Sequence, residues 1–573
     1  MNFAIRNLLE HLYGADAART ILPRLVRILD AHRSRKTGSE QRAARADFSG
    51  RDSILITYGD QVREPGVKPL RSLAEFAEQH LAGVVSAIHL LPFYPASSDD
   101  GFSVKDYLAV DSALGDWSDI ARLRERFDLM FDAVFNHLSA QSQWFQRFLQ
   151  DDPNYRDYFV TVEGEPDLSR VVRPRALPLL TVFQTAAGPR KVWTTFSADQ
   201  VDLNARNPEV LLALIEVLLF YVARGARFIR LDAIAYLWKE IGTSCIHRPQ
   251  THRIIQLMRA VLDDVAPGVL LLTETNVPHA ENLSYFGDGA NEAQLVYNFA
   301  LPPLVLHTLS SANAETLNRW VQSLALPSDR VTFFNFLASH DGIGLNPVRG
   351  ILSQPELDGL VERAQAHGGF ISYKHNADGS KSPYELNINY FDALSNPAGH
   401  EPIDTQIQRF LVAQAIMLSL AGVPGIYFHS LFGSRGDRAG ADASGIPRRI
   451  NRQRLSRSEL ELDLASPPSL RARIFSPYCE LLNLRRSHPA FDPRGRQEVV
   501  ECDPRVFALL RASPDGPGRA LCLHNVSDES VSLSVQLTGE AKNQLAGSVA
   551  DSDGQIRRTL QPYEVAWLTG GIS

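Results

Sequence analysis

The sequence predicts an α/β protein built on a (β/α)8 TIM barrel, with inserted small domains and a C-terminal antiparallel β domain. Two observations predict the barrel: short, continuously apolar runs recur along the chain, and longer segments with helical spacing separate them. A third observation predicts the C-terminal domain. Past about residue 490 the runs alternate apolar and polar positions, with Gly, Pro and Asp between them.

Seven runs mark the strands of the barrel. Each is too short for a helix and too continuous for a strand that is wet on one face, which is typical of strands buried in a parallel sheet. Strands that alternate with helices form βα units, and seven or eight such units in one chain indicate a closed barrel. The runs are SILITYG (53–59), VVSAIHLLPF (84–93), DLMFDAVFNH (128–137), GARFIRLDA (225–233), GVLLLTET (268–275), RVTFFNFLASH (330–340) and AGVPGIYF (421–428).

Long spacings between the runs divide the chain into domains. About 90 residues separate FNHLS from FIRLD, far more than one crossover helix needs, so we expect an inserted domain after the third strand. A polar, Gly-bearing stretch after ASHDGIG predicts a second insertion. The predicted domains are an N-terminal helical arm (1–48), the barrel (49–137, 206–344 and 396–489), inserted domain B (138–205), the second insertion (345–395) and the C-terminal β domain (490–573).

The N-terminal arm is predicted to contain two short amphipathic helices followed by a polar linker. In the second helix, Ile21, Leu22, Leu25, Ile28 and Leu29 recur at helical spacing. We expect the arm to pack on the main body; a partner interface is the alternative.

Composition excludes several classes of protein. The 573 residues carry 58 Lys and Arg against 65 Asp and Glu, a formal charge of −7, which gives no reason to expect nucleic acid as a partner. With 44% hydrophobic and 21% charged residues, the chain is typical of soluble globular proteins. Its four cysteines form no C-x-x-C pair, and we find neither a signal-peptide pattern nor an apolar window of about 18 residues. We expect a cytoplasmic protein with no membrane span, no metal and no cofactor.

Polar residues follow four of the predicted strands at the point where each strand ends. Taken singly, each would be a helix cap or a solvated loop residue. Taken together, three carboxylates and two histidines at strand ends of one barrel must converge on its mouth. The residues are Asn136, His137, Arg230, Asp232, Glu274, His340 and Asp341.

Converging carboxylates suit glycosyl transfer with retention of configuration. One carboxylate attacks the anomeric carbon, while a second, about 5 to 5.5 Å away, protonates the leaving oxygen and later activates the acceptor. An arginine beside the nucleophile favours its charged form. Arg230 and Asp232, two residues apart on one strand, point to the same face of the sheet. A plain structural salt bridge is the alternative interpretation of this pair.

Four segments resemble a known family. DAVFNH, FIRLDA, LLTET and ASHDG resemble, in order and separation, the four signature regions of the α-amylase superfamily, glycoside hydrolase family 13. Within that family the chain is similar to the sucrose phosphorylase group from about residue 50 to 490. The segments that carry this second likeness are AIHLLPFYP, the RPR segment, VDLN, RLDAIAYLWKEIGTSC, YNFALPPLVLHTL, SHDGIG, NINYFDAL and GVPGIYF.

The resemblance implies roles for the strand-end residues. Asp232 would be the nucleophile that forms a β-glucosyl ester, Glu274 the general acid/base, and Asp341 the third carboxylate, which holds the glucose hydroxyls. His137 would support the site, and a purely structural histidine is the alternative. The residues expected to grip the donor glucose are Asp60, His89, Arg230, His340 and Arg448.

The resemblance also implies where the acceptor binds. Arg173 and Arg175 match a segment that contributes to phosphate binding in the group, and guanidinium groups suit phosphate oxygens. The surface-charge alternative for this pair stays open. Further expected substrate contacts are Tyr236, Asn276, Tyr384 and Glu385.

In the acceptor loops the chain departs from the best-known sucrose phosphorylases. Tyr384-Glu385 stands where they commonly carry a Tyr-Gln pair, and Thr275-Asn276 stands where they commonly have a His. The leaving group is therefore open. Cations in the second insertion would suit an anionic aglycone, although a merely solvated loop is the alternative. These cations are Lys374, His375 and Lys381.

The resemblance implies a retaining α-glucoside phosphorylase. It would transfer glucosyl from sucrose, glucosylglycerate or sucrose 6′-phosphate to inorganic phosphate, giving α-D-glucose 1-phosphate without a cofactor. One rival is a sucrose hydrolase or transglucosidase of the same family, and the other is a non-catalytic sugar-binding barrel. The expected partners are therefore the α-glucoside and phosphate, and a homodimer stays open.

Overall fold

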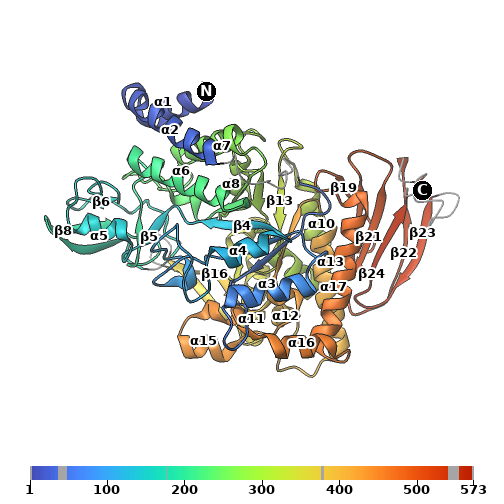
Figure 1. The fold of residues 1–573 in the computed structure, drawn as a ribbon. Coiled ribbons are helices and arrows are strands. Elements are labelled where there is room, and N and C mark those ends of the chain that lie inside the picture. The colour runs from blue at the N-terminus through green and yellow to red at the C-terminus, as the bar shows by residue number, and fades with distance from the viewer. Residues whose placement is uncertain are drawn as a thin grey trace.

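A closed barrel of eight parallel strands forms the centre of the molecule (Figure 1). The computed structural model describes residues 3–35, 48–175, 177–375, 380–539, 542 and 554–570. The strands follow the order β1-β17-β13-β12-β11-β10-β4-β3 around the barrel, which confirms the predicted (β/α)8 fold. Their bounds are β1 (Ile54–Thr57), β3 (Ala87–Leu90), β4 (Asp128–Ala133), β10 (Ala226–Leu231), β11 (Leu270–Thr273), β12 (Leu295–Tyr297), β13 (Thr332–Asn335) and β17 (Val423–Tyr427).

The eighth strand, β12, does not stand out in the sequence. It is only three residues long, too short for a recognisable apolar pattern. Its place in the barrel comes from its pairing with β11 on one side and β13 on the other. The seven longer apolar runs correspond to the other seven strands.

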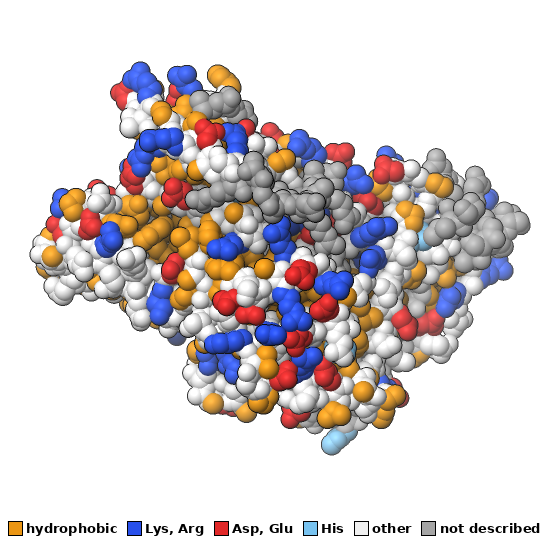
Figure 2. Space-filling view, in the orientation of Figure 1, with side chains coloured by type: hydrophobic (Ala, Val, Ile, Leu, Met, Phe, Trp, Pro, Cys, Tyr) orange, Lys and Arg blue, Asp and Glu red, His pale blue; other side chains and the backbone are white. Residues whose placement is uncertain are grey.

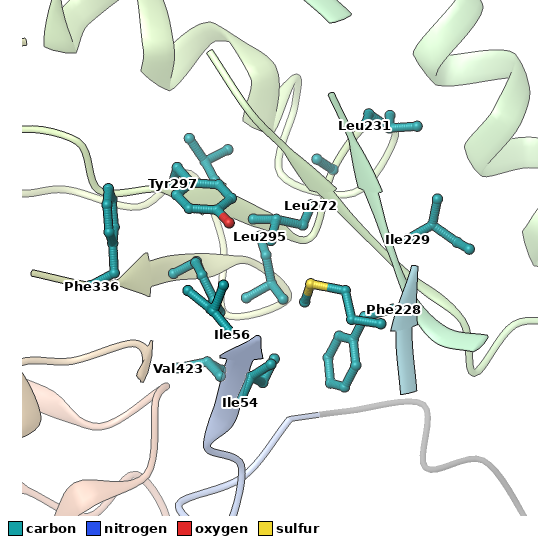
Figure 3. Close-up of a cluster of buried hydrophobic side chains, with 14 of the residues drawn as sticks. Ile54, Ile56, Phe228, Ile229, Leu231, Leu272, Leu295, Tyr297, Phe336 and Val423 are labelled. Atoms are coloured by element: carbon teal, nitrogen blue, oxygen red, sulfur yellow. The ribbon is translucent and has the colours of Figure 1, made fainter. Parts of the chain in front are cut away.

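Apolar side chains from several strands meet inside the barrel (Figure 3). Ile54 and Ile56 of β1 and Phe228 of β10 are fully buried members of this cluster. Because side chains alternate along a strand, the face of β10 that carries Phe228 carries Arg230 two residues later and leads on to Asp232. The apolar filling of the barrel therefore ends where the polar residues of its mouth begin.

Helices cover the outside of the barrel (Figure 1). Helix α7 (Pro249–Val265) shows why they form: it begins with a proline at its first turn and buries Ile254, Leu257, Met258 and Val261 at helical spacing. The other main helices are α3 (Pro69–His80), α4 (Trp117–Arg124), α6 (Pro208–Ala223), α8 (His279–Leu283), α9 (Leu301–Ser311), α10 (Glu315–Ser323), α13 (Ile403–Ser419) and α17 (Leu470–Ser487).

The N-terminal arm consists of α1 (Phe3–Tyr13) and α2 (Ala15–Arg35) and packs on the barrel's outer helices. The Tyr13 hydroxyl donates to the Ala205 carbonyl at 2.8 Å, and Arg24 donates to the Glu209 carboxylate at 2.6 Å. Both partners lie at or just before α6, which leads into β10. The arm therefore braces the helix that precedes the strand bearing Arg230.

Two stretches between barrel strands carry small sheets of their own. Between β4 and β10 lie the antiparallel sheets β5-β9 and β6-β8-β7, and after β13 lies the sheet β14-β16-β15. The elements of the first stretch are β5 (His137–Ser139), α5 (Gln143–Leu149), β6 (Thr161–Val162), β7 (Leu180–Thr185), β8 (Gly188–Trp193) and β9 (Gln200–Asp202). Those of the second are β14 (Ile343–Gly344), α11 (Gln354–Ala366), β15 (Phe370–His375), β16 (Lys381–Asn387) and α12 (Tyr390–Leu394).

The C-terminal part folds into antiparallel sheets, as predicted, and lies at one end of the molecule (Figure 1). One sheet has the order β19-β20-β21-β24, and β22 pairs with β23. The strands are β19 (Arg496–Val499), β20 (Val506–Ala512), β21 (Arg519–Asn525), β22 (Val531–Gln536), β23 (Gln555–Leu560) and β24 (Val565–Gly570).

The surface is mixed in charge. Figure 2 shows Lys and Arg side chains interspersed with Asp and Glu on the face it presents. Among the described residues, we find no helix that is both long and apolar enough to cross a membrane.

Gly425 of β17 offers a test of packing inside the barrel. A Cβ atom at this position would lie 2.3 Å from Cζ of the buried Phe334 ring. We expect Gly425→Ala to lower the free energy of unfolding by about 1 to 3 kcal/mol through overpacking, measured as a lower unfolding midpoint. Gly359→Ala in α11 is the matched control, since its Cβ would meet no atom within 4 Å, and a helix gains about 0.5 to 1 kcal/mol from this change. Equal midpoint shifts in the two variants would contradict the analysis.

Candidate active site

A cavity of about 390 Å³ lies at the C-terminal ends of the barrel strands. Asp232 directly follows β10, Glu274 directly follows β11, and Asp341 comes after β13. All three side chains line this cavity. The structure thus brings the three carboxylates expected from the sequence to one place.

Arg230 joins Asp232 to a second buried carboxylate. Its Nη1 donates to Asp232 Oδ1 at 2.8 Å and also to Asp132 Oδ1. Asp132 in turn contacts His89, with Nε2 and Oδ2 2.8 Å apart. Arg230 and His89 are buried beneath the cavity wall, so both lie behind Asp232 and not among the residues that line the cavity.

A left-handed turn links Asp232 to Glu274. Ala233 has a φ of 50°, a conformation that residues other than glycine rarely adopt. In this turn its backbone N–H donates to Glu274 Oε2 at 3.1 Å. The amide next to Asp232 therefore fixes the carboxyl group of Glu274.

Burial changes the acidity of both carboxyl groups. It raises the pKa of Asp232 well above the usual range, and the charge of Glu274 adds to the rise, whereas the Arg230 guanidinium opposes it. Burial likewise raises the pKa of Glu274, with Arg230 opposing and Asp341 adding to the rise. Because the charge of Glu274 raises the pKa of Asp232, the two carboxyl groups favour holding one proton between them. One proton on the pair leaves one proton donor, the role expected of Glu274, and one ionised nucleophile.

Arg448 bridges two carboxylates at the cavity wall. Its Nε and Nη2 donate to Glu385 Oε1 and Oε2 at 2.9 and 2.6 Å, and its Nη1 lies 2.8 Å from Asp341 Oδ1. Burial works to raise the pKa of Asp341, but Arg448, His340 and Arg452 outweigh it and hold that pKa well below its usual range. Asp341 is therefore ionised near neutral pH.

Two histidines line the cavity as neutral groups. Burial lowers the pKa of His340 to about 3 and that of His137 to about 4. The His340 ring stacks on Phe102 at a centroid distance of 5.1 Å. The two rings shape the cavity without adding charge near neutral pH.

A buried polar network lies beside His137, whose Nδ1 is 3.3 Å from Asn136 Nδ2. Lys239 Nζ lies 2.6 Å from Asp202 Oδ2 and donates to Asn136 Oδ1 at 2.6 Å. Asn136 Nδ2 also donates to Asp202 Oδ2, at 3.2 Å. This ammonium cross-links β9 to the loop between β4 and β5.

Among the described residues, no group of three or more His, Cys, Asp or Glu is placed to hold a metal ion.

The two arginines of the RPR segment differ in position. Arg175 lines the cavity, where its guanidinium lies over the Phe196 ring at 5.7 Å and 3.3 Å from Asp99 Oδ2. Arg173 is exposed and donates to the Leu177 carbonyl, so it is turned away from the cavity. Only Arg175 of this pair is brought to the site.

Of the other residues expected to bind substrate, some line the cavity and some do not. Asp60 lies in the turn after β1 and pairs with Arg63 at 2.7 Å and Arg454 at 2.6 Å, so it does not line the cavity. Lys374 is half-buried on β15 and Lys381 is exposed on β16, both outside the cavity lining. The side chain of His375 lies outside the described residues. The expected contacts that do line the cavity are Tyr236, Asn276, Tyr384, Glu385, His340 and Arg448.

Four residues that the sequence does not predict for the site also line the cavity: Asp99, Phe102, Phe196 and Gln200. Asp99 Oδ2 accepts from Gln200 Nε2 at 3.1 Å as well as from Arg175. Asp99 could have been predicted, because its segment SSDDGF closely follows the strand run AIHLLPFYP and strand ends point toward the site. No sequence pattern predicts that Phe196 and Gln200 line the cavity, since their positions depend on how the first insertion folds over the barrel.

Comparison with known proteins shows the family of the chain. The family described as "Alpha amylase, catalytic domain" matches residues 81–342. The chain is 50% identical over 566 residues to glucosylglycerate phosphorylase of Allomeiothermus silvanus, covering 98% of each chain. It is 31% identical over 482 residues to sucrose phosphorylase of Agrobacterium vitis, covering 79% of this chain and 91% of that one. The chain belongs to the α-amylase family.

Within this family the protein is an α-glucoside phosphorylase of the sucrose phosphorylase group, and therefore a glycosyltransferase. The crystal structure of sucrose 6F-phosphate phosphorylase from Thermoanaerobacter thermosaccharolyticum has the same fold. Its TM-score is 0.73 at 24% identity, and the match covers 89% of the phosphorylase described here and 98% of that chain.

His137 predicts how the stability of this phosphorylase depends on pH. Its folded pKa of about 4 lies below the value of about 6.5 in an unfolded chain. Below pH 6.5 His137 takes up a proton in the unfolded state but stays neutral in the folded state. The free energy of unfolding therefore falls with pH, and this group accounts for a loss of about 3 kcal/mol at pH 4. We therefore expect His137→Gln to lose less stability than wild type between pH 7 and 4, measured by urea unfolding.

The same replacement at the exposed His11 controls for the loss of a histidine as such. Parallel pH profiles for wild type and His137→Gln would show that this imidazole is not held neutral by burial.

Proposed function

We propose that this phosphorylase acts on glucosylglycerate. It transfers the glucosyl group to inorganic phosphate, which yields α-D-glucose 1-phosphate and releases glycerate. The observation that carries the choice of donor is the pattern of similarity, because the chain matches the A. silvanus glucosylglycerate phosphorylase along nearly its whole length and far more strongly than the A. vitis sucrose phosphorylase.

The charge of the acceptor side supports this donor. Glycerate carries a carboxylate, so both the leaving aglycone and the incoming phosphate are anions. A guanidinium group suits both, and Arg175 presents one to the cavity. Fructose, the aglycone of sucrose, is neutral and would not use this charge.

In the first displacement an ionised Asp232 attacks the anomeric carbon. Glu274 gives its proton to the glycosidic oxygen, so the bond to glycerate breaks as the bond to Asp232 forms. Arg230 positions the nucleophile through Oδ1 and leaves Oδ2 for the attack. It also opposes the effect of burial on the Asp232 pKa.

In the second displacement a phosphate oxygen attacks the same carbon from the opposite side. The ester bond to Asp232 breaks, and the proton of dihydrogen phosphate returns to Glu274, which restores the starting enzyme. Two inversions give overall retention. Water must be kept from the ester during this step, and the 7% exposure of Asp232 fits that requirement.

A phosphorolysis screen tests the proposed function. We expect glucose 1-phosphate to form only when phosphate is supplied, with kcat/KM for glucosylglycerate at least about tenfold above that for sucrose, glucosylglycerol and sucrose 6′-phosphate. Asp232→Asn should lower turnover by about a thousandfold or more, because no ester can form. Free glucose released at the same rate without phosphate would identify a hydrolase, and no turnover of any donor would identify a sugar-binding protein.

The two arginines of the RPR segment provide a matched pair of variants. Arg175→Ala should raise the KM for phosphate by about 10- to 100-fold, since it removes a charge-assisted contact inside the cavity. Arg173→Ala removes the same charge from the same segment but outside the cavity, and should change the KM by less than about twofold. Similar KM values for the two variants would remove Arg175 from the phosphate site.

A further inference from the structure

A second cavity, of about 620 Å³, lies on the other side of β5 from the active site. Side chains alternate along a strand, so His137 and Leu138 of β5 point in opposite directions. His137 lines the active site, whereas Leu138 lines the second cavity. The buried Tyr107 also lines the second cavity, and its hydroxyl donates to the Val134 carbonyl at 2.6 Å. Among the described residues none lines both cavities, so they are separate sites.

Segments far apart in the sequence form the walls of the second cavity. Ile28 and Ala31 line it from one face of α2 in the N-terminal arm, and Glu216 and Phe220 line it from α6. Trp144 of α5 lines it from the first insertion. Figure 2 shows hydrophobic side chains gathered on this face of the molecule, between the arm and the first insertion. Without the arm, the second cavity would lack one of its walls.

Aromatic rings supply much of the wall. Trp144 packs against Tyr158 and Tyr107 at centroid distances of 5.4 and 5.9 Å, and Tyr155 packs against Tyr158 at 4.7 Å. Trp144, Tyr155 and Tyr158 are only partly buried, so each keeps surface for a ligand. The negative face of an aromatic ring attracts the C–H bonds on the apolar face of a sugar ring. Because the rings already pack on one another, binding would cost little ordering of side chains.

Polar groups on the same wall are left for a ligand. In the part of the chain that the structure describes, four polar side-chain groups on this wall make no hydrogen bond or ion pair. They are the Lys105 ammonium, the Gln143 amide, the Trp144 indole N–H and the Glu216 carboxylate. They include both donors and acceptors. Such a set fits hydroxyl groups, because each hydroxyl donates one hydrogen bond and accepts others.

The charges of the wall favour an uncharged ligand. Lys105 contributes one positive charge, whereas Asp106 and Glu216 contribute two negative charges. The carboxylates oppose an anion, and the ammonium beside them opposes a cation. The active site differs in this respect, since Arg175 and Arg448 present guanidinium groups there. Apolar ring surface together with unpaired donors and acceptors suits a molecule that has both C–H faces and hydroxyl groups.

We propose that the second cavity is a binding site for a neutral saccharide. A saccharide bound there is not cleaved, because Asp232 and Glu274 lie in the other cavity. The arm then has a role beyond packing, since Ile28 and Ala31 help to enclose the saccharide. The inference does not depend on which donor the active site uses.

Equilibrium dialysis with labelled maltose tests the proposal, in the Asp232→Asn variant so that no glucosyl transfer occurs. We expect Glu216→Ala or Trp144→Ala, added to this variant, to weaken the second site at least about tenfold. At a concentration that saturates the unaltered site, the number of maltose molecules bound per chain should then fall by one. Glu163→Ala is the matched control, because it removes an exposed carboxylate of the same insertion outside both cavities, and it should leave the number unchanged.

Two further measurements separate ligand binding from damage to the fold. Trp144→Phe keeps an aromatic ring and should keep the second maltose, even if Trp144→Ala fails to fold. In the otherwise unaltered enzyme, Glu216→Ala should change kcat and the KM for phosphate by less than about twofold, since Glu216 lies outside the active site. Sulfate and choline, an anion and a cation, should displace no maltose from the second site.

The proposal is overturned if Glu216→Ala leaves the number of bound maltose molecules unchanged, or if Glu163→Ala lowers it equally. Displacement of the second maltose by choline or sulfate would also overturn it, because the cavity would then be an ion site. Failure of the enzyme to use glucosylglycerate would overturn the proposed function and leave the maltose result standing.

Discussion

The site depends on a buried guanidinium held between two carboxylates. Arg230 joins Asp132 on β4 to Asp232 after β10, and His89 on β3 completes the chain of contacts. Burying these charges costs free energy that only close pairing and hydrogen bonding can offset. Pairing of neighbouring parallel strands in register supplies that geometry, since Arg230 lies directly opposite Asp132. The barrel therefore creates the electrostatic environment of Asp232 before any substrate binds.

Neighbouring arginines set the acidity of the three carboxyl groups at the mouth of the barrel. Arg230 opposes burial at Asp232 and Glu274, whereas Arg448 with its fork to Glu385 keeps Asp341 ionised. Asp341 differs in acidity from Asp232 and Glu274 although all three are buried, because Arg448 and Arg452 lie beside it, whereas Asp232 and Glu274 share Arg230. Asp341 therefore stays charged, while Asp232 and Glu274 favour holding one proton between them, which leaves one nucleophile and one proton donor for the proposed reaction.

Much of the barrel could be predicted from the sequence, because buried parallel strands leave continuous apolar runs with polar residues at their ends. Asp232 and Glu274 follow their strands directly and were identified for that reason. The positions of residues on the inserted segments were harder to predict from the sequence. Arg175 and Arg173 look equivalent in the sequence, but only the folded loop turns one toward the cavity and the other to solvent. Asp60 shows the same limit, since its carboxylate pairs with Arg63 and Arg454 and does not line the cavity.

The floor and the walls of the cavity have separate origins in the chain. The floor comes from strand ends of the barrel, whereas Arg175, Phe196 and Glu385 arrive on segments inserted between strands. Sequence drift in those segments leaves the hydrogen-bonded frame of the barrel intact. Substitutions in the inserted segments could thus change which leaving group the enzyme accepts, while the residues at the strand ends of the barrel stay the same.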